Sequence, residues 1–551
     1  MKTATCMGAL VTIGASLAAA HAGPPALHFT DVTADSGIDL VLTSGRFPLS
    51  QILEVKGGGL GLIDFDNDGD LDLFAPNGAT LDSPFAGPGC RLFENLGSMH
   101  FKDITQEAGL TFDRWGMGVV VGDYDADGFD DLFIACYGSN ALLRNRGDAT
   151  FEDVTDAAGV AGSDAWTTGC AFADLDADGD LDLYTVNYVR FDPDAPPAPG
   201  QFKSMDVFGG PRGMEADHDV LYENLGDGTF RDITRQAGCL PDTARFGLGV
   251  AILDLNADGL QDIFVGNDSD PNFFFVNQGN LRFEERGFYS GLAANMDGIN
   301  QATMGIGVAD VDGNALPDLF TTNFSSDTNT LHMNLDGEIF DERTAQYGLG
   351  MVSRQFLGWA CGFYDFDQDA DEDLVVVNGH VYSEATPETA DSSFRQPPML
   401  FERAGRRFEF VETDRAGACM IEPHVDRSMV GGDLDGDGDI DLAIGELNGP
   451  LRILANDGEG KGDWLIVELR EREGVGNRHA VGVTIVLTHG DSQQRRWIVG
   501  GGGFQSTSAQ YAHFGLGASA GEVAITVTWP DGIAQTIEGV APNQHLILRR
   551  E

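Results

Sequence analysis

Asp64-Phe65-Asp66-Asn67-Asp68-Gly69-Asp70-Leu71-Asp72 is an acidic loop with carboxylates at positions 1, 3, 5 and 9 and glycine at position 6. Oxygen ligands at this spacing can fold back around one hard cation, and calcium is the cation that prefers several such ligands. Glycine at position 6 permits the sharp turn that the loop needs. The stretch therefore predicts a calcium-binding loop.

The pattern occurs seven times. The loops span residues 64–72, 123–131, 174–182, 254–262, 310–318, 365–373 and 433–441. A single Asp-rich hairpin without metal is an ordinary alternative, but seven copies in register argue against it for the set. The repetition indicates one structural unit used seven times.

The predicted calcium ligands are the side chains at positions 1, 3, 5 and 9 and the backbone carbonyl at position 7. For the seven loops in order they are Asp64, Asp66, Asp68, Asp70, Asp72; Asp123, Asp125, Asp127, Phe129, Asp131; Asp174, Asp176, Asp178, Asp180, Asp182; Asp254, Asn256, Asp258, Leu260, Asp262; Asp310, Asp312, Asn314, Leu316, Asp318; Asp365, Asp367, Asp369, Asp371, Asp373; and Asp433, Asp435, Asp437, Asp439, Asp441. Up to seven calcium ions are expected, held as rigid structural clips.

The fifth and sixth loops depart from the pattern because Ala315 and Ala370 stand at position 6. A positive φ is strained for alanine. We expect these two loops to bind calcium more weakly or to adopt altered turns.

A short phrase, Phe29-Thr-Asp-Val-Thr33, recurs between the loops, with clear copies from Phe101, Phe151 and Phe230 and looser copies from Phe283, Phe340 and Phe408. Its alternation of apolar and polar residues is typical of a half-buried strand. With the strands on either side of each loop, each repeat contains four short strands, which is the content of a propeller blade. The sequence predicts an all-β fold, a seven-bladed β-propeller over residues 23–460.

The ends of the repeat region predict how the ring closes. The seventh loop is followed by a strand at Leu451–Asn456 but by no phenylalanine phrase, whereas the phrase at Phe29 precedes the first loop. The first strand is therefore expected to complete the last blade, which removes two exposed edges.

Residues 461–551 lack acidic loops and show alternating apolar segments, such as Trp464 to Leu469 and Val523 to Trp529. They predict a separate small all-β domain. Two polar or proline-rich insertions, Phe191 to Asp219 and Ser383 to Pro398, interrupt the repeats. Such segments are either partner-contact sites or surface loops without a role.

Charge excludes some partners. The chain has 87 acidic and 33 basic residues and a formal charge of -54, which argues against nucleic acid or an anionic membrane as the main partner. The N-terminus, with Lys2, an apolar run and Ala20-His21-Ala22, predicts a signal peptide over residues 1–22. A periplasmic, cell-surface or extracellular location follows, and no later segment is apolar enough to span a bilayer. After removal of residues 1–22, six cysteines remain, and their pairing cannot be read from the sequence.

Three further motifs have ordinary explanations. His513 lacks an evident nucleophile partner and is interpreted as a packed turn histidine. The run Gly500 to Gly503 lacks the Lys and Ser/Thr of a phosphate-binding loop and is interpreted as a turn. Arg146-Gly147-Asp148 spells an integrin-recognition tripeptide, but it lies where the repeats place a hairpin turn, as at Gly226-Asp227.

The repeat region resembles the FG-GAP and VCBS repeat proteins, whose calcium-bearing propeller also occurs in the integrin α-subunit head. The C-terminal part resembles an ASPIC/UnbV domain through Gly476 to Val483, Gly500 to Ser508, His513 to Gly517 and Trp529 to Gly532. The order of the two parts is similar to that of the cartilage acidic protein family. The resemblance implies an exported calcium-binding protein with an interaction role and supplies no catalytic mechanism.

The main functional hypothesis is a non-enzymatic binding or adhesion module for an extracellular or envelope protein or glycan. The alternative is an enzyme that acts on polysaccharide or in a tailoring pathway, with its site on the central face of the propeller or in the Phe191 insertion. Propellers host many chemistries, so the fold alone does not exclude the alternative.

Overall fold

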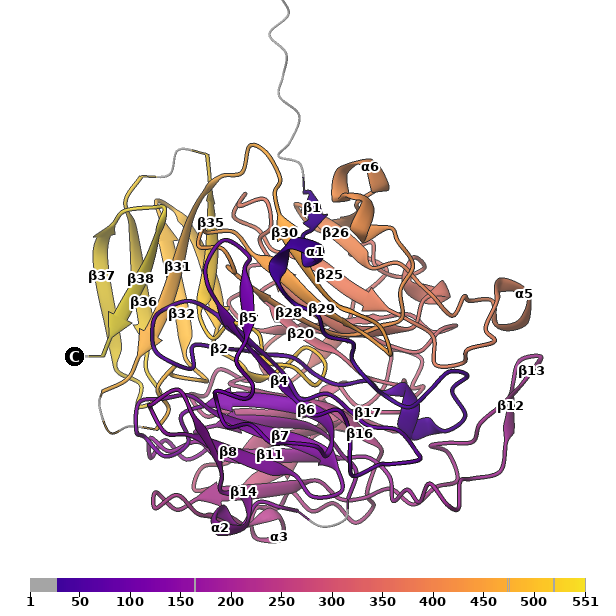
Figure 1. The fold of residues 1–551 in the computed structure, drawn as a ribbon. Helices are drawn as coiled ribbons and strands as arrows, with labels where there is room; N and C mark the ends of the chain where they lie inside the picture. The colour runs from indigo at the N-terminus through magenta and orange to yellow at the C-terminus, as the bar shows by residue number, and fades with distance from the viewer. Residues whose placement is uncertain (1–26, 163–164, 473, 475, 519–520, 551) are drawn as a thin grey trace, which may run out of the picture.

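The computed structural model describes residues 27–162, 165–472, 474, 476–518 and 521–550, and the predicted signal peptide lies outside them. The described residues form an all-β molecule (Figure 1). Seven of its antiparallel sheets share one strand order. The all-β, propeller-like fold expected from the sequence is confirmed.

Each of the seven sheets, here called blades 1 to 7, contains four strands given from the innermost to the outermost. Blade 1 contains β2 (Gly61–Ile63), β3 (Asp72–Ala75), β4 (Arg91–Asn95) and β5 (Phe101–Asp103), and blade 2 contains β6 (Trp115–Gly122), β7 (Asp131–Tyr137), β8 (Ala141–Asn145) and β9 (Phe151–Asp153). Blade 3 contains β10 (Thr167–Ala173), β11 (Asp182–Asn187), β14 (Val220–Asn224) and β15 (Phe230–Asp232), and blade 4 contains β16 (Gly247–Leu253), β17 (Asp262–Asn267), β18 (Phe273–Asn277) and β19 (Phe283–Glu285). Blade 5 contains β20 (Ile306–Ala309), β21 (Asp318–Thr321), β22 (Thr330–Asn334) and β23 (Phe340–Glu342), and blade 6 contains β24 (Gly358–Tyr364), β25 (Asp373–Asn378), β26 (Met399–Ala404) and β27 (Arg407–Phe410). Blade 7 contains β28 (Asp426–Gly432), β29 (Asp441–Glu446), β30 (Leu451–Asn456) and β1 (Phe29–Asp31).

Blade 7 closes the ring as predicted. The first strand, β1, pairs antiparallel with β30, with Phe29 opposite Asn456 and Asp31 opposite Leu454. The innermost strands contact one another in the order β2, β6, β10, β16, β20, β24, β28 and back to β2. Every blade is therefore held between two neighbours, and no innermost strand is left at an open end.

The recurrent phrase ending in threonine fixes the outermost strand of a blade to the third strand. The Thr155 hydroxyl accepts a hydrogen bond from the Leu142 backbone N–H (2.9 Å), and its own proton goes to Asp153 (2.5 Å). Thr105, Thr234, Thr344 and Thr33 accept from the equivalent N–H groups. These bonds satisfy backbone donors that would otherwise be buried without a partner.

Helices are short and lie in the connections. They are α1 (Thr33–Ser36), α2 (Thr155–Ala158), α3 (Thr234–Ala237), α4 (Gly287–Ser290), α5 (Pro387–Ala390) and α6 (Thr413–Ala416), with 3-10 turns η1 (Ile52–Val55), η2 (Ser353–Gln355) and η3 (Ala418–Met420). None of the helices in the described part of the chain is long and apolar enough to cross a bilayer.

The C-terminal region forms two further sheets at one side of the propeller (Figure 1). One has the order β35 (Ala512–Gly517), β31 (Asp463–Arg470), β38 (Gln544–Arg549), and the other has the order β33 (Ser492–Trp497), β32 (Thr484–His489), β36 (Val523–Thr528), β37 (Ala534–Val540). Their inner faces share one hydrophobic core with blades 2, 3 and 4, including Val467, Ile525 and Ile252. The C-terminal region therefore has its own sheets but is not packed separately from the propeller.

Residues 500–511, here called the plug, enter the axis of the propeller. The plug includes β34 (Gly500–Gly501), which pairs with β16 of blade 4, and Gly503 exchanges two backbone hydrogen bonds with Ile306 of blade 5 (2.7 and 2.8 Å). Thr507 bonds to blade 1 and Gln505 to blade 2 through backbone groups, while Phe504 packs on Trp359 of blade 6 at 5.0 Å between ring centroids.

The remaining two blades also meet the plug, because β10 of blade 3 contacts β34 and the Ala509 N–H donates to Gly431 of blade 7. The interpretation of Gly500 to Gly503 as a simple turn is therefore wrong. Glycine is required because a Cβ on Gly501 would lie 2.5 Å from the carbonyl oxygen of Val250.

The two insertions meet on the side opposite the C-terminal sheets (Figure 1). The first insertion contains the hairpin β12 (Gly200–Phe202) and β13 (Met205–Val207), and the second contains α5. Lys203 bonds to the Ala390 carbonyl (2.6 Å) and to Asp391 (2.9 Å), and Met205 packs on Ala385. The insertions are thus ordered against each other.

All six cysteines in the described residues are buried and unpaired.

Candidate metal centres in the acidic loops

Each acidic loop connects the innermost strand of a blade to the second strand. The backbone N–H at position 6 donates to the carboxylate at position 1 in all seven loops, at 2.8 to 3.4 Å. The carboxylate at position 9 accepts from the N–H at position 2, at 2.8 to 3.3 Å. The loops are therefore closed by their own carboxylates, and all seven have one geometry.

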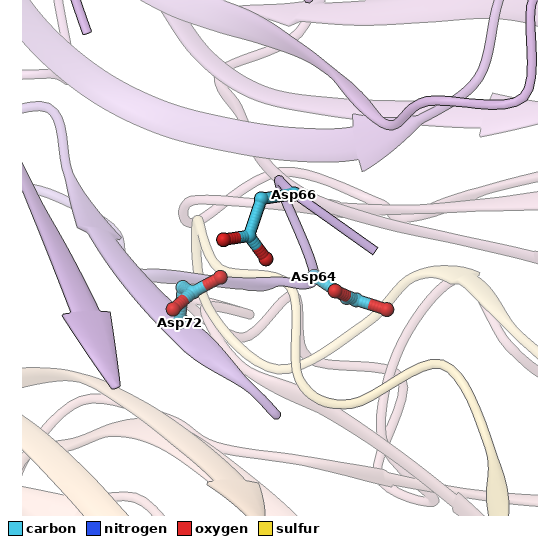
Figure 2. Close-up of side chains that lie close together, drawn as sticks. All are labelled: Asp64, Asp66 and Asp72. Atoms are coloured by element: carbon cyan, nitrogen blue, oxygen red, sulfur yellow. The ribbon is translucent and has the colours of Figure 1, made fainter. Parts of the chain in front are cut away.

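The predicted ligands converge. Carboxylate oxygens of Asp64, Asp66 and Asp72 lie within 4.8 Å of one another, and Figure 2 shows these three side chains gathered at the first loop. The same holds at the second, third, fifth and sixth loops for Asp123, Asp125, Asp127; Asp174, Asp176, Asp178; Asp310, Asp312, Asp318; and Asp365, Asp367, Asp369. Like charges at this separation repel one another strongly, so the arrangement suits a divalent cation.

Two of these carboxylates have a buried oxygen that is available to a cation. Asp125 Oδ1 and Asp310 Oδ1 are buried and have no hydrogen-bond partner among the described residues. A buried acceptor without a partner is costly, and a bound cation removes that cost. When bound, a calcium ion would supply positive charge at the centre of each loop and join its turns.

Burial shifts the acidity of the loops. It raises the pKa of Asp72 to about 9 and that of Asp318 to about 8, with neighbouring aspartates adding to the shift. Burial likewise raises the pKa of Asp123 and of Asp174 to about 7. In the metal-free protein burial therefore favours the protonated form of these carboxyl groups, and a cation would compete with those protons.

Two positions of every loop have left-handed backbone. Position 6 has φ from 77° to 98°, and this includes Ala315 at 77° and Ala370 at 86°. The two alanines therefore adopt the same turn as glycine instead of an altered one, and they carry the strain. The weaker calcium binding predicted for these loops stays a prediction. Position 4 is also left-handed, with residues Asn67, Ala126, Ala177, Ala257, Gly313, Gln368 and Gly436, and the sequence analysis did not identify it.

Models of two families match the sequence. The FG-GAP-like repeat model matches residues 64–134, 123–185, 203–265 and 254–321, and the ASPIC and UnbV model matches residues 474–551. The chain carries FG-GAP repeats and an ASPIC/UnbV domain. Three of the four repeat matches begin at the first residue of an acidic loop.

Similarity to cartilage acidic protein 1 extends over most of the chain. The mouse protein is 26% identical over 502 residues, which cover 86% of this chain and 70% of the relative. The human protein is 26% identical over 501 residues, which cover 86% of this chain and 69% of the relative. This homology confirms the family resemblance expected from the motifs.

Two solved lectin structures are more distantly similar. BP39L lectin from Burkholderia pseudomallei has a TM-score of 0.45 at 9% identity, covering 74% of this chain and 98% of that chain. An Agrocybe aegerita protein that recognises non-reducing terminal N-acetylglucosamine has a TM-score of 0.37 at 15% identity, covering 70% of this chain and 85% of that chain.

A polar residue at the end of the third strand, asparagine in six of the seven blades, joins each blade to its neighbour. The Asn145 side chain donates to the carbonyl of Phe65, in the loop of the preceding blade (2.7 Å), and its backbone N–H donates to Asp131 (2.7 Å). Asn95, Asn224, Asn277, Asn334 and Asn456 make the same inter-blade bond, and Arg403 makes it in blade 6. The sequence analysis missed these residues, although most precede a hairpin glycine by two positions.

Position 8 of the loops makes three of the contacts between the ASPIC/UnbV region and the propeller. It is apolar in blades 1, 3, 5 and 7 but is Asp130, Gln261 and Glu372 in blades 2, 4 and 6. All three are buried. Asp130 pairs with His479 (2.8 Å), Gln261 donates to the Val481 carbonyl (3.4 Å), and Glu372 pairs with Arg496 (3.2 Å). This break in an apolar position is the signal that the sequence analysis overlooked.

Asp130 lies at the centre of a group of charged residues that joins the ASPIC/UnbV region to the second loop. Burial alone would raise the pKa of Asp130, but the charges of His479, Arg478 and Arg470 lower it to about 2. Arg478 also donates to the Gly128 carbonyl (2.8 Å), and the Asn477 N–H donates to the Gly179 carbonyl (3.0 Å). The ASPIC/UnbV region therefore holds the turns that carry the predicted ligands.

The structure shows where the other motifs noted in the sequence lie. His513 lies in β35, not in a turn, and its Nε2 is hydrogen-bonded to the Gly438 carbonyl (3.1 Å); burial lowers its pKa to about 4. Arg146-Gly147-Asp148 forms the exposed turn between β8 and β9, where Arg146 pairs with Glu152 (3.0 Å). The plug lies in the propeller axis, at the central face that is one location of the enzyme alternative. The other location, the Phe191 insertion, packs against the second insertion.

Proposed function

We propose that this protein is an exported, calcium-stabilised propeller that acts as a non-enzymatic binding module for an extracellular or envelope protein or glycan. The observation that carries the proposal is the convergence of carboxylates, some with unpartnered buried oxygens, at loops that share one geometry around the ring. A rigid ring of this kind presents surface loops in fixed positions.

The non-enzymatic part of the proposal is supported by the plug, which lies in the propeller axis. Phe504 is fully buried on Trp359, and the plug reaches the innermost strands of all seven blades. Ligand recognition then takes place on the outer surfaces or at the junction of the two regions.

Thermal unfolding with calcium, magnesium or chelator tests the calcium part. At calcium tenfold above its dissociation constant, each site should add about 1.4 kcal/mol to the free energy of unfolding, so several sites should raise the melting temperature by many degrees. An unchanged melting temperature in chelator would contradict the proposal.

A matched pair of variants localises the effect. Asp68→Ala should lower the calcium stoichiometry by one in a calorimetric titration, while Asp297→Asn, an exposed acid outside the loops, should leave it unchanged. The binding part is tested by capture of protein or glycan from the exported fraction with and without calcium.

A further inference from the structure

A cavity of about 620 Å³ lies between the first two acidic loops and the ASPIC/UnbV region. Asp64, Asp68 and Asp127 line one wall, and residues of β31 and β38 line the other. Cavities of roughly 300 to 1,000 Å³ are typical of small-molecule sites. This cavity, here called the junction cleft, is thus large enough for a short oligosaccharide.

The register of β31 and β38 builds the second wall. Because alternate residues of a strand share a face, His545, Ile547 and Arg549 lie on one face of β38. The strands are parallel, with Glu468 beside Ile547 and Arg470 beside Arg549. The opposite face contributes Val467, Leu469 and Leu548 to the core. The sheet therefore buries its apolar face and presents a polar face to the junction cleft, with Arg470, His545 and Arg549 beside Glu468.

Two arginines of this wall differ from the others in having no partner for their guanidinium groups among the described residues. Arg470 pairs with Glu468 and with Asp64 (3.6 Å), and Arg478 lies 3.8 Å from Asp130. By contrast, the guanidinium groups of Arg472 and Arg549 have no ion pair or hydrogen bond within the described ranges, although both line the cleft. In a chain with 87 acidic residues, two unpaired arginines beside a cavity provide donors for an anionic group.

The facing wall has the opposite character. Asp68 and Asp127 are exposed there. Each carboxylate has two oxygens, so one can bind the predicted calcium ion of its loop while the other accepts from a sugar hydroxyl. Ile547, which is 51% exposed, offers an apolar surface for a ring face. A uronic acid presents hydroxyl donors on one edge and a carboxylate on another, which matches both walls. An inorganic anion would use only the arginine wall, and a neutral sugar only the aspartate wall.

We propose that the junction cleft binds a short acidic oligosaccharide, with Arg472 and Arg549 holding a uronate carboxylate. The inference rests on the proposed binding function and names its ligand class and its site.

Calorimetric titration of the full chain with defined trimers of galacturonate, glucuronate, mannuronate and guluronate, in excess calcium, tests it. We expect one or more trimers to bind and the fully methyl-esterified trimer of the same sugar to bind at least about tenfold more weakly, because the esters remove the charge that guanidinium groups recognise. The double variant Arg472→Gln, Arg549→Gln should lose about tenfold or more in affinity.

Arg406→Gln is the matched control, since Arg406 is exposed at the β26–β27 turn, far along the chain from the cleft residues. It should bind like wild type, and all three proteins should have the same melting temperature. The proposal is overturned if no uronate trimer binds at millimolar concentration, if the ester binds equally well, or if the double variant binds like wild type. Failure of the calcium melting test with intact uronate binding would overturn the calcium proposal and leave the cleft standing.

Discussion

At the scale of single residues, the acidic loops show that ligand positions and turn positions have different requirements. The predicted side-chain ligands are all aspartate or asparagine because a hard cation prefers oxygen ligands. Positions 4 and 6 need a left-handed backbone, which Asn67 and several alanines adopt as well as glycine. A left-handed φ costs a non-glycine residue about 1 to 2 kcal/mol. Strain of this size persists only where the surrounding hydrogen bonds fix the turn.

Ala370→Gly should stabilise the sixth loop. Relief of about 1 to 2 kcal/mol of strain exceeds the about 0.4 to 1 kcal/mol that glycine adds to the entropy of the unfolded chain, so a net gain of about 0.5 to 1 kcal/mol is expected. Denaturant unfolding measures it, and calcium titration should show tighter binding at one site. Ala404→Gly is the control because Ala404 lies on β26 without a positive φ; it should destabilise. Equal effects of the two changes would contradict the strain argument.

The convergence of carboxylates could be predicted from the sequence because each loop contains its predicted ligands within nine positions. The inter-blade asparagines could not, since Asn145 and Phe65 are 80 positions apart in the chain and meet only when the ring forms. The contact made by position 8 could not be predicted for the same reason, because the partner of Asp130 is His479, which lies far away in the sequence. Local spacing predicts local chemistry, and it says little about partners brought in by the fold.

At the scale of elements, the plug is the segment that the sequence described least well. Gly500 to Gly503 has no apolar periodicity, so nothing in it predicts a strand. Its pairing with β16 depends on a binding surface built by seven distant strands. The propeller strands were easier to predict because their alternation and their loops repeat, and closure by β1 followed from a surplus strand at one end and a missing one at the other.

Gly501→Ala should destabilise the protein much more than Gly490→Ala. Both glycines have positive φ, but a Cβ at Gly501 meets the Val250 carbonyl at 2.5 Å, whereas one at Gly490 has no atom within 4 Å. The clash should add about 1 to 3 kcal/mol to the strain that both variants share. Denaturant unfolding monitored by tryptophan fluorescence compares them. Equal losses would mean that the plug is not held in the axis.

At the scale of the whole molecule, electrostatic repulsion between acidic residues destabilises the folded state. The formal charge is -54, and many of the carboxylates are gathered at the loops. Protons and cations are alternative ways to reduce that repulsion. The metal-free fold and the calcium-loaded fold should therefore respond to pH in different ways.

In chelator, the melting temperature should fall as pH rises from about 6 to about 9. Folding raises the pKa of Asp72 to about 9 and that of Asp318 to about 8, so these groups stabilise the metal-free fold below their unfolded pKa and lose that effect as pH rises through these values. In excess calcium the cation replaces the protons, so the dependence should be much smaller. Circular dichroism melts at several pH values measure both series, and parallel curves would refute the coupling.

The alternation at position 8 has a consequence for assembly. Seven similar blades would offer the ASPIC/UnbV region seven rotational settings around the axis, and each would place its sheets over a different pair of loops. Asp130, Gln261 and Glu372 mark alternate blades of a ring with an odd number of sheets, so no rotation maps the three marked blades onto themselves. The three polar residues therefore fix the orientation of the ASPIC/UnbV region on the ring, because only one rotational setting lets His479, Val481 and Arg496 make their contacts together.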